Sequence, residues 1–224
     1  LGAQTGAIND FIFSSPSRIV ACFLTVAENK TIFYHIAITL WETLLSFFLV
    51  ISLSLAAALL LWAWKSFADV AEPYLVALNS LPKSALAPLL IVWLGNNMKT
   101  IIVAAVSVAL FGSVMTLFTS FRQTDKEKIK LIYSLGGTRK DVLSKVLLPS
   151  SVPIIISNMK VNIGLCLVGV IIGEFLAANA GLGYLIIYGQ QTFRMDQVVM
   201  SISILCLISA GLYQGISILE KRIH

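Results

Sequence analysis

The chain has 224 residues, of which 58% are hydrophobic and only 12% are charged, and its mean hydropathy is +0.89. A soluble domain is about half apolar and about a quarter charged, so this composition excludes an ordinary soluble protein and indicates an integral membrane protein. The formal net charge of +5 is concentrated in one segment between apolar runs and at Lys221-Arg222, a distribution typical of cytoplasmic loops that argues against nucleic-acid binding.

Residues 1–34 are too mixed in composition to cross a bilayer, and we expect them to form an extracytoplasmic segment. Ser15-Pro16 is a plausible helix start, and Ile19, Val20 and Phe23 then fall on one face. The pattern predicts a short amphipathic helix over about Pro16–Glu28 that rests on the membrane surface.

Five helical spans are predicted after this segment, and no alternation typical of a β-barrel accompanies them. The uncharged runs Thr43–Trp64, Thr100–Phe121 and Gln197–Leu219 each exceed the roughly 20 residues that a crossing helix needs. The predicted spans are 36–64, 70–95, 100–121, 153–173 and 197–219.

The second predicted span contains three prolines, Pro73, Pro82 and Pro88, and is expected to kink near Pro82. Broken helices at membrane depth usually face protein or a water-filled cavity, which makes this span a candidate wall of a pathway.

Charge sets the expected orientation of the spans. Placing the basic segment 122–150 in the cytoplasm also places Lys65 and Lys221-Arg222 there, and leaves residues 1–34 and Glu174–Asp196 outside as connections. The chain would then start outside with an odd number of spans, which suggests that one further helix precedes it.

The segment Leu131–Pro153 carries the most distinctive local pattern. Gly136-Gly137 should end one short helix, and Thr138 can cap a second helix that runs over Arg139–Leu148 until Pro149. The second helix is amphipathic, with Val142, Leu143, Val146 and Leu147 on one face. Such a helix either lies on the membrane surface or docks into a groove of a soluble partner.

This segment resembles the cytoplasmic coupling loop of binding-protein-dependent ABC importer permeases, whose pattern is E-A-A-x-x-x-G, nine residues, then I-x-L-P. Gly136 and Val146-Leu147-Leu148-Pro149 match it, whereas Lys130-Leu131-Ile132 stands where the family has E-A-A. The alternative is an ordinary basic loop between two spans.

Two further stretches resemble the nitrate/sulfonate/taurine branch of these permeases. Asn79–Gly95, NSLPKSALAPLLIVWLG, is similar to that branch's S-[IL]-P-x-x-A-x-x-P-L-x-I-x-W-x-G segment, and Glu174–Ile186 is similar to the segment after its fifth helix. With Ser15-Pro16-Ser17-Arg18, which resembles the segment after the first family helix, the similarity covers nearly the whole chain in order.

The resemblance implies an all-α polytopic bundle of the type I importer kind, with six family helices, in a bacterial inner membrane. It implies a second permease subunit, which we expect to form a homodimer with this chain, two ATP-binding subunits that hold ATP-Mg, an extracytoplasmic solute-binding protein, and no cofactor on this chain. The implied coupling residues are Ser134, Leu135, Gly136, Gly137, Arg139, Val142, Leu143, Val146, Leu148 and Pro149. Among these, Leu135, Gly136, Val142 and Leu143 are expected to form the docked face.

Five residues are candidates for the translocation path: Pro82, Lys83, Pro88, Gly112 and Glu174. Glu174 either lines the path or is an interfacial carboxylate that caps the following turn, because a charge at membrane depth is costly. Lys83 either serves an anionic substrate or faces the cytoplasmic surface. Glu42 is expected to reach the outer interface.

No P-loop, H-E-x-x-H or G-x-S-x-G pattern is present in the sequence, and no metal-ligand spacing is seen, so we expect no catalysis by this chain. The alternative function is a secondary transporter or channel that works without ATP. That class should show membrane-embedded charges or an internal repeat, and neither is clear here.

Overall fold

The computed structural model describes residues 31–223, so the amphipathic helix predicted over Pro16–Glu28 lies outside the described residues. Helices are the only regular structure in the described part, which confirms the predicted all-α fold class. They are α2 (Thr31–Ala63), α3 (Lys65–Ser80), α4 (Lys83–Leu94), α5 (Met98–Arg122), α6 (Lys126–Ser134), α7 (Arg139–Val142), the π-helical turn η1 (Leu143–Leu147), α8 (Leu148–Ala177), α9 (Leu182–Gln191) and α10 (Met195–Ile223).

Four of these helices, α2, α5, α8 and α10, are long and apolar enough to cross a membrane. A fifth span results if α3 and α4 are counted together, because they are bent by 101° at a short break that contains Pro82. Proline lacks an amide N–H and restricts the residue before it, which explains why the helix breaks where the sequence predicts a kink.

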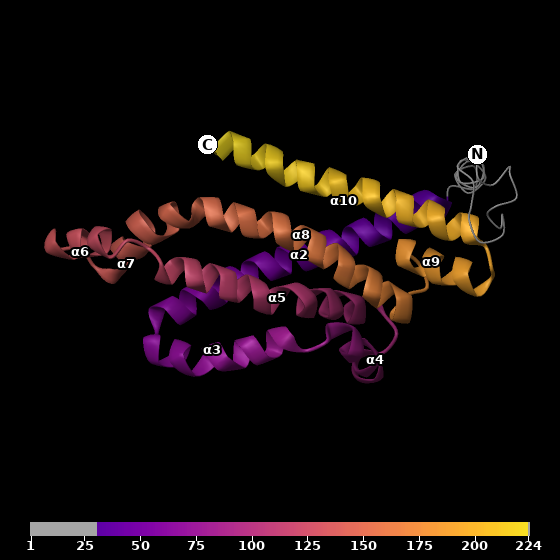
Figure 1. The fold of residues 1–224 in the computed structure, drawn as a ribbon, viewed down its shortest axis with the longest axis horizontal. Coiled ribbons are helices and arrows are strands. Elements are labelled where there is room, and N and C mark those ends of the chain that lie inside the picture. The colour runs from indigo at the N-terminus through magenta and orange to yellow at the C-terminus, as the bar shows by residue number, and fades with distance from the viewer. Residues whose placement is uncertain (1–30, 224) are drawn as a thin grey trace, which may run out of the picture.

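The long helices form an elongated bundle (Figure 1). α5 lies at its centre and packs most extensively against α8 and α2, while α3 and α4 run along one side and α10 along the opposite edge. The α6–α7 segment projects at one end of the bundle, and α9 lies at the other end. We call these the α6–α7 end and the α9 end.

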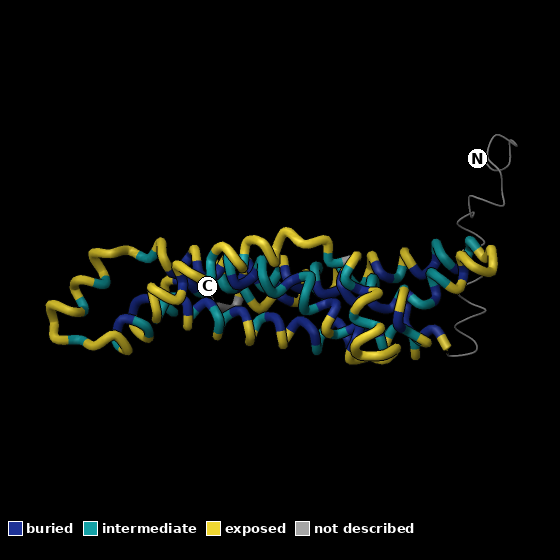
Figure 2. Tube along the Cα trace, turned by 90° about the horizontal axis from the view of Figure 1, so that it is seen from below, coloured by how far each residue is buried: buried dark blue, intermediate teal, exposed yellow. Residues whose placement is uncertain are grey.

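Apolar clusters fill the bundle from end to end. At the α6–α7 end, Leu117, Phe121 and Leu147 are nearly completely buried together with Ala58 and Leu61 of α2. Figure 2 shows this burial along the middle of the bundle, while the projecting α6–α7 segment is exposed almost throughout. The projecting segment is therefore held by few contacts of its own.

The connection predicted over Glu174–Asp196 is more structured than expected. α8 continues to Ala177, and α9 (Leu182–Gln191) fills most of the remainder before α10 starts at Met195. The buried apolar side chains of α9, Leu182 and Leu185, pack beside Ile32 and Met200, so tertiary packing stabilises a helix too short to be stable alone.

Candidate coupling loop and translocation path

The α6–α7 connection has the geometry that its sequence predicts. α6 ends at Ser134, and Gly136 follows with a φ of +78°, a left-handed conformation that favours glycine. The Thr138 side chain accepts a hydrogen bond from the amide of Asp141, and the Asp141 carboxylate accepts one from the amide of Thr138. This capping box confirms that Thr138 starts the second helix.

Asp141 is the most strongly bonded carboxylate in the loop. Its Oδ2 atom accepts from the Thr138 backbone N–H at 2.8 Å and from the Thr138 hydroxyl at 2.7 Å, and Oδ1 lies 2.8 Å from the Lys145 ammonium. The hydrogen bond from Lys145, with those from Thr138, holds the pKa of the Asp141 carboxyl well below its ordinary value. The loop corner is therefore fixed by an ionised side chain at neutral pH.

The second helix does not end at Pro149, contrary to the sequence prediction. α7 passes through η1 directly into α8, which contains both Pro149 and Pro153 and runs on to Ala177. In η1 the amide of Leu148 bonds to the carbonyl of Leu143, one residue farther back than in an α-helix. A π-helical turn of this kind accommodates the bond that Pro149 cannot make.

Burial differs among the predicted coupling residues. Ser134, Leu135, Gly136 and Arg139 are exposed, and Leu135 is 75% exposed despite its apolar side chain. Val142 and Val146 are almost completely buried in the chain's own interior, at 0% and 7% exposure. The structure therefore assigns Val142 to internal packing and corrects its predicted place on a docked face. The remaining predicted residues are half-buried or, for Pro149, exposed: Gly137, Leu143, Leu148 and Pro149.

Two exposed apolar side chains of α6 were not predicted as coupling residues. Leu131 is 58% exposed and Tyr133 is 50% exposed, and both precede Leu135 by a few residues. The sequence contained a signal for them, because apolar residues alternate with lysines over Lys126–Ser134 and exposed apolar side chains often mark an interaction surface. Leu131, Tyr133 and Leu135 are thus three exposed apolar side chains of the loop.

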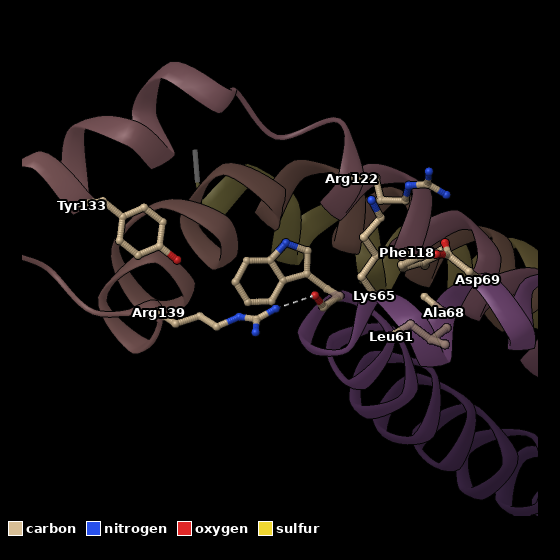
Figure 3. Close-up of a pocket in the computed structure, with 9 residues that line it drawn as sticks. Leu61, Lys65, Ala68, Asp69, Phe118, Arg122, Tyr133 and Arg139 are labelled. Carbon is tan, nitrogen blue, oxygen red and sulfur yellow. Dashed lines mark hydrogen bonds between the residues drawn. The ribbon is translucent and has the colours of Figure 1, made fainter.

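A pocket of about 390 Å³ lies between the coupling loop and the ends of the long helices (Figure 3). The Arg139 guanidinium extends across it to Trp62, donating to the Trp62 backbone carbonyl at 3.2 Å and lying 5.2 Å from the indole ring. Its remaining lining includes Lys65 and Arg122, together with Leu61, Ala68, Asp69, Phe118 and Tyr133. We call it the Arg139 pocket.

Three of the predicted path residues, Pro82, Lys83 and Gly112, lie together beside the end of α3. The Lys83 ammonium donates to the backbone carbonyl of Asn79, directly after the break at Pro82. Gly112 of α5 faces the same residue, since a Cβ added there would lie 3.4 Å from the Asn79 side-chain oxygen. Pro88 is exposed on α4, farther along the same side of the bundle.

Glu174 lies apart from these residues, near the α9 end, where it is 1% exposed. Its Oε1 atom accepts a hydrogen bond from the Thr39 hydroxyl at 2.7 Å, and its Oε2 atom accepts one from the amide of Gly183 at 2.6 Å. Glu174 therefore caps the first turn of α9 from inside the bundle.

Glu42 is 2% exposed and does not reach the outer interface as the sequence predicted. Its side chain lies beside that of Glu174, while its Oε2 atom has no hydrogen-bond partner among the described residues. The sequence could not reveal this contact, because residues 132 positions apart meet only through the packing of α2 on α8.

A second polar cluster in the bundle was missed by the sequence analysis. Ser113 of α5 donates to Ser54 of α2 at 2.9 Å and accepts from the amides of Asn158 and Asn162 of α8, at 2.7 and 3.2 Å. These bonds join the three central helices away from water, as interhelical polar contacts do in membranes. In the part of the chain that the structure describes, no cluster of His, Cys, Asp or Glu could hold a metal ion.

The fold has close counterparts among solved structures. A chain of the MetNI methionine ABC transporter in an inward-facing conformation superposes with a TM-score of 0.77 at 16% sequence identity, covering 87% of this chain and 96% of that chain. At this level of identity the likeness shows the fold alone, which is that of a type I ABC importer permease.

Several sequence relatives extend over most of the chain. A probable ABC transporter permease protein of Haemophilus influenzae is 30% identical over 98% of this chain and 89% of its own length. The formylaminopyrimidine transport permease protein ThiX of Halalkalibacterium halodurans is 28% identical over 94% and 84%, and the taurine transport system permease protein TauC of Escherichia coli is 22% identical over 96% and 80%.

The sequence profile of the family described as "binding-protein-dependent transport system inner membrane component" matches residues 50–224. This range contains the coupling loop and every predicted path residue. Together with the apolar helices, it places the chain in the inner membrane as a multi-pass protein. The chain belongs to this family and is the permease component of an ABC importer.

Proposed function

We propose that this chain forms one half of a translocation path for a small solute and that a second permease subunit, most simply a copy of the same chain, forms the other half. α3 and α4 support this assignment, because their apolar side chains lie open along one side of the bundle. Tyr74 is 68% exposed, Val92 is 81% exposed and Trp93 is 70% exposed. Apolar patches of this extent beside a bent, proline-broken span fit a path wall completed by another subunit.

In the proposed assembly, two separate ATP-binding subunits hold ATP-Mg and hydrolyse it, and they dock on the α6–α7 loop at the cytoplasmic face. The observation that carries this step is the projecting loop itself, whose Leu131, Tyr133 and Leu135 are exposed on a segment held by the Gly136 turn and the Thr138–Asp141 capping box. Short amphipathic helices of this kind fit a groove on a soluble partner.

The continuous helix from α7 through η1 into α8 gives the loop a rigid connection to the core. Movement of the docked loop would be passed along α8, which packs against α5 and α2 and carries Glu174 at its far end. The permease would thus move between two discrete arrangements, with the energy supplied by nucleotide binding and hydrolysis on the partner.

An extracytoplasmic binding protein would deliver the solute at the α9 end. The relatives' names include transport of taurine, of aliphatic sulfonates and of formylaminopyrimidine. We accordingly propose a small solute of the sulfonate, taurine, nitrate or thiamine-precursor class.

The test is ATPase activity in reconstituted vesicles containing the permease, its ATP-binding subunit and the candidate binding protein, with and without solute. We expect stimulation by the loaded binding protein, and we expect Leu135→Ser to abolish it. Leu135 is exposed, so this change removes a docking contact without opening a cavity in the permease.

Lys126→Ser, at the exposed start of α6, is the matched control and should retain stimulation. The proposal fails if the ATP-binding subunit does not associate with this chain. It fails equally if the Leu135→Ser complex keeps full solute-stimulated activity.

A further inference from the structure

The Arg139 pocket has a composition that the importer function does not require. Three of its lining residues are cationic, Lys65, Arg122 and Arg139, and Asp69 is its only acidic lining residue. Aromatic side chains of Trp62, Phe118 and Tyr133 complete its walls. A pocket with excess positive charge and aromatic walls suits an oxyanion attached to an apolar body.

Two of the three cations keep hydrogen-bond donors available. Arg122 is engaged, because it forms an ion pair with Glu72 at 3.0 Å. Arg139 uses one guanidinium nitrogen for the Trp62 carbonyl, which leaves further N–H groups of its five. Lys65 makes no ion pair with any residue in the described part of the chain. Figure 3 shows Lys65 and Arg139 in different parts of the pocket wall.

The residues around the pocket are typical of the level of lipid headgroups. It surrounds the end of α2, where Trp62 and the 61%-exposed Trp64 mark an interfacial belt. Directly beyond it on α3, Phe67 and Val70 are 50% and 62% exposed. The acyl chain of a lipid could lie along these apolar side chains while its headgroup occupies the pocket. A free anion would have no use for the apolar side chains.

We propose that the Arg139 pocket binds the phosphate group of an anionic phospholipid, held between Lys65 and Arg139. Lys65 starts α3 and Arg139 starts α7, so one phosphate joins the α2–α3 corner to the coupling loop. Phosphate is recognised well by a guanidinium fork and by an ammonium point charge. The bound lipid braces the loop on its membrane side and leaves Leu131 and Leu135, which do not line the pocket, free for the ATP-binding subunit.

The experiment measures lipid retention by the assembled importer without nucleotide, so its outcome does not depend on transport. The complex is equilibrated in nanodiscs containing phosphatidylglycerol and phosphatidylcholine, extracted into mild detergent, and its retained lipids are quantified by mass spectrometry. Variants are Lys65→Gln, Arg139→Gln and the double variant. The control is the double variant Lys126→Gln and Lys140→Gln, which removes the same charge from exposed positions outside the pocket.

We expect wild type to retain phosphatidylglycerol selectively and each pocket variant to retain about fivefold less, since a basic residue near an anionic membrane surface contributes about 1 kcal/mol. The control should retain as much as wild type. Equal loss in the control, or equal retention of the two lipids by wild type, would overturn the proposal.

A free oxyanion is the other source of the same chemistry. If millimolar inorganic phosphate or taurine displaces the retained phosphatidylglycerol from wild type, the pocket is a soluble-anion site and the lipid assignment is wrong. Retention that resists both anions supports the lipid. Leu135→Ser separates this inference from the proposed function. It should weaken association of the ATP-binding subunit, as the proposed function requires, and leave lipid retention unchanged.

Discussion

The hydroxyl of Thr39 on α2 donates a hydrogen bond to Oε1 of Glu174 on α8 across 2.7 Å, and the same hydroxyl oxygen accepts one from the amide of Leu182 at 2.9 Å. One side chain thus joins three helices at the α9 end. Because both groups are buried, each depends on the other for the polar contacts that water would otherwise supply.

Thr39→Val should destabilise the permease, because it keeps the shape of the side chain but leaves the Glu174 carboxylate and the Leu182 amide each short of a partner. Leaving buried polar groups unsatisfied costs about 1–3 kcal/mol each. A lower thermal midpoint of the purified complex would reveal this. Thr116→Val is the matched control, since Thr116 is exposed and bonds only within α5. An equal shift in both variants would contradict the expectation.

Gly169→Ala should disturb the packing of α8 on α5. A Cβ at this position would lie 2.6 Å from the Cα atom of Ala105, and backbone cannot move aside as a flexible side chain can. Overpacking of this kind costs about 1–3 kcal/mol. Gly164→Ala, in the same helix, meets nothing within 4 Å and should be neutral or slightly stabilising. Chemical or thermal denaturation of the two variants side by side decides the matter, and equal stability would argue against close packing at Gly169.

The acid sensitivity of the coupling loop follows from Asp141. Its folded-state pKa is lowered, so the stabilisation from its ionised form is complete above the unfolded value of about 3.9 and is lost as pH falls below it. Hydrogen-exchange protection of the bonded amides of Thr138, Asp141 and Val142, corrected for intrinsic exchange, should be constant from about pH 5 to 8. It should fall only in stronger acid.

Asp141→Asn supplies the control for this pH dependence, since it cannot titrate and should lower protection at every pH. A loss of protection in wild type centred above about pH 5 would show that another group governs the loop.

Local signals in the sequence predicted local structure well. Gly136, Thr138 and the proline at 82 each act through their own backbone chemistry, and the structure confirms the turn, the cap and the break that they predict. Glu42 and Asn158 were beyond reach of that reasoning, because their burial depends on helices brought together by packing.

Pro149 shows why a strong local signal can still mislead. Proline tends to end a helix because it lacks the amide N–H and its ring clashes with the carbonyl four residues earlier. Here the π-helical turn η1 and the buried Val146 and Leu147 keep the chain helical through Pro149. The docked face predicted from helical periodicity was wrong at Val142, because this side chain is buried in the chain's own interior. Periodicity identifies an apolar face, and only the fold decides whether that face meets a partner or the chain's own core.

Gly136→Val should weaken coupling more than assembly. The left-handed φ of +78° is unfavourable for a β-branched residue by about 1–2 kcal/mol, while a Cβ there would meet nothing within 4 Å. The strain is therefore conformational and falls on the angle between α6 and α7, and the membrane helices are untouched. We expect normal membrane insertion and dimer formation but reduced solute-stimulated ATPase activity.

Gly136→Asn should retain more activity, because asparagine tolerates this conformation. Gly215→Val on α10, where a Cβ also meets nothing, should retain full stimulation. Undiminished stimulation in the Gly136→Val complex would mean that the α6–α7 angle does not carry the coupling.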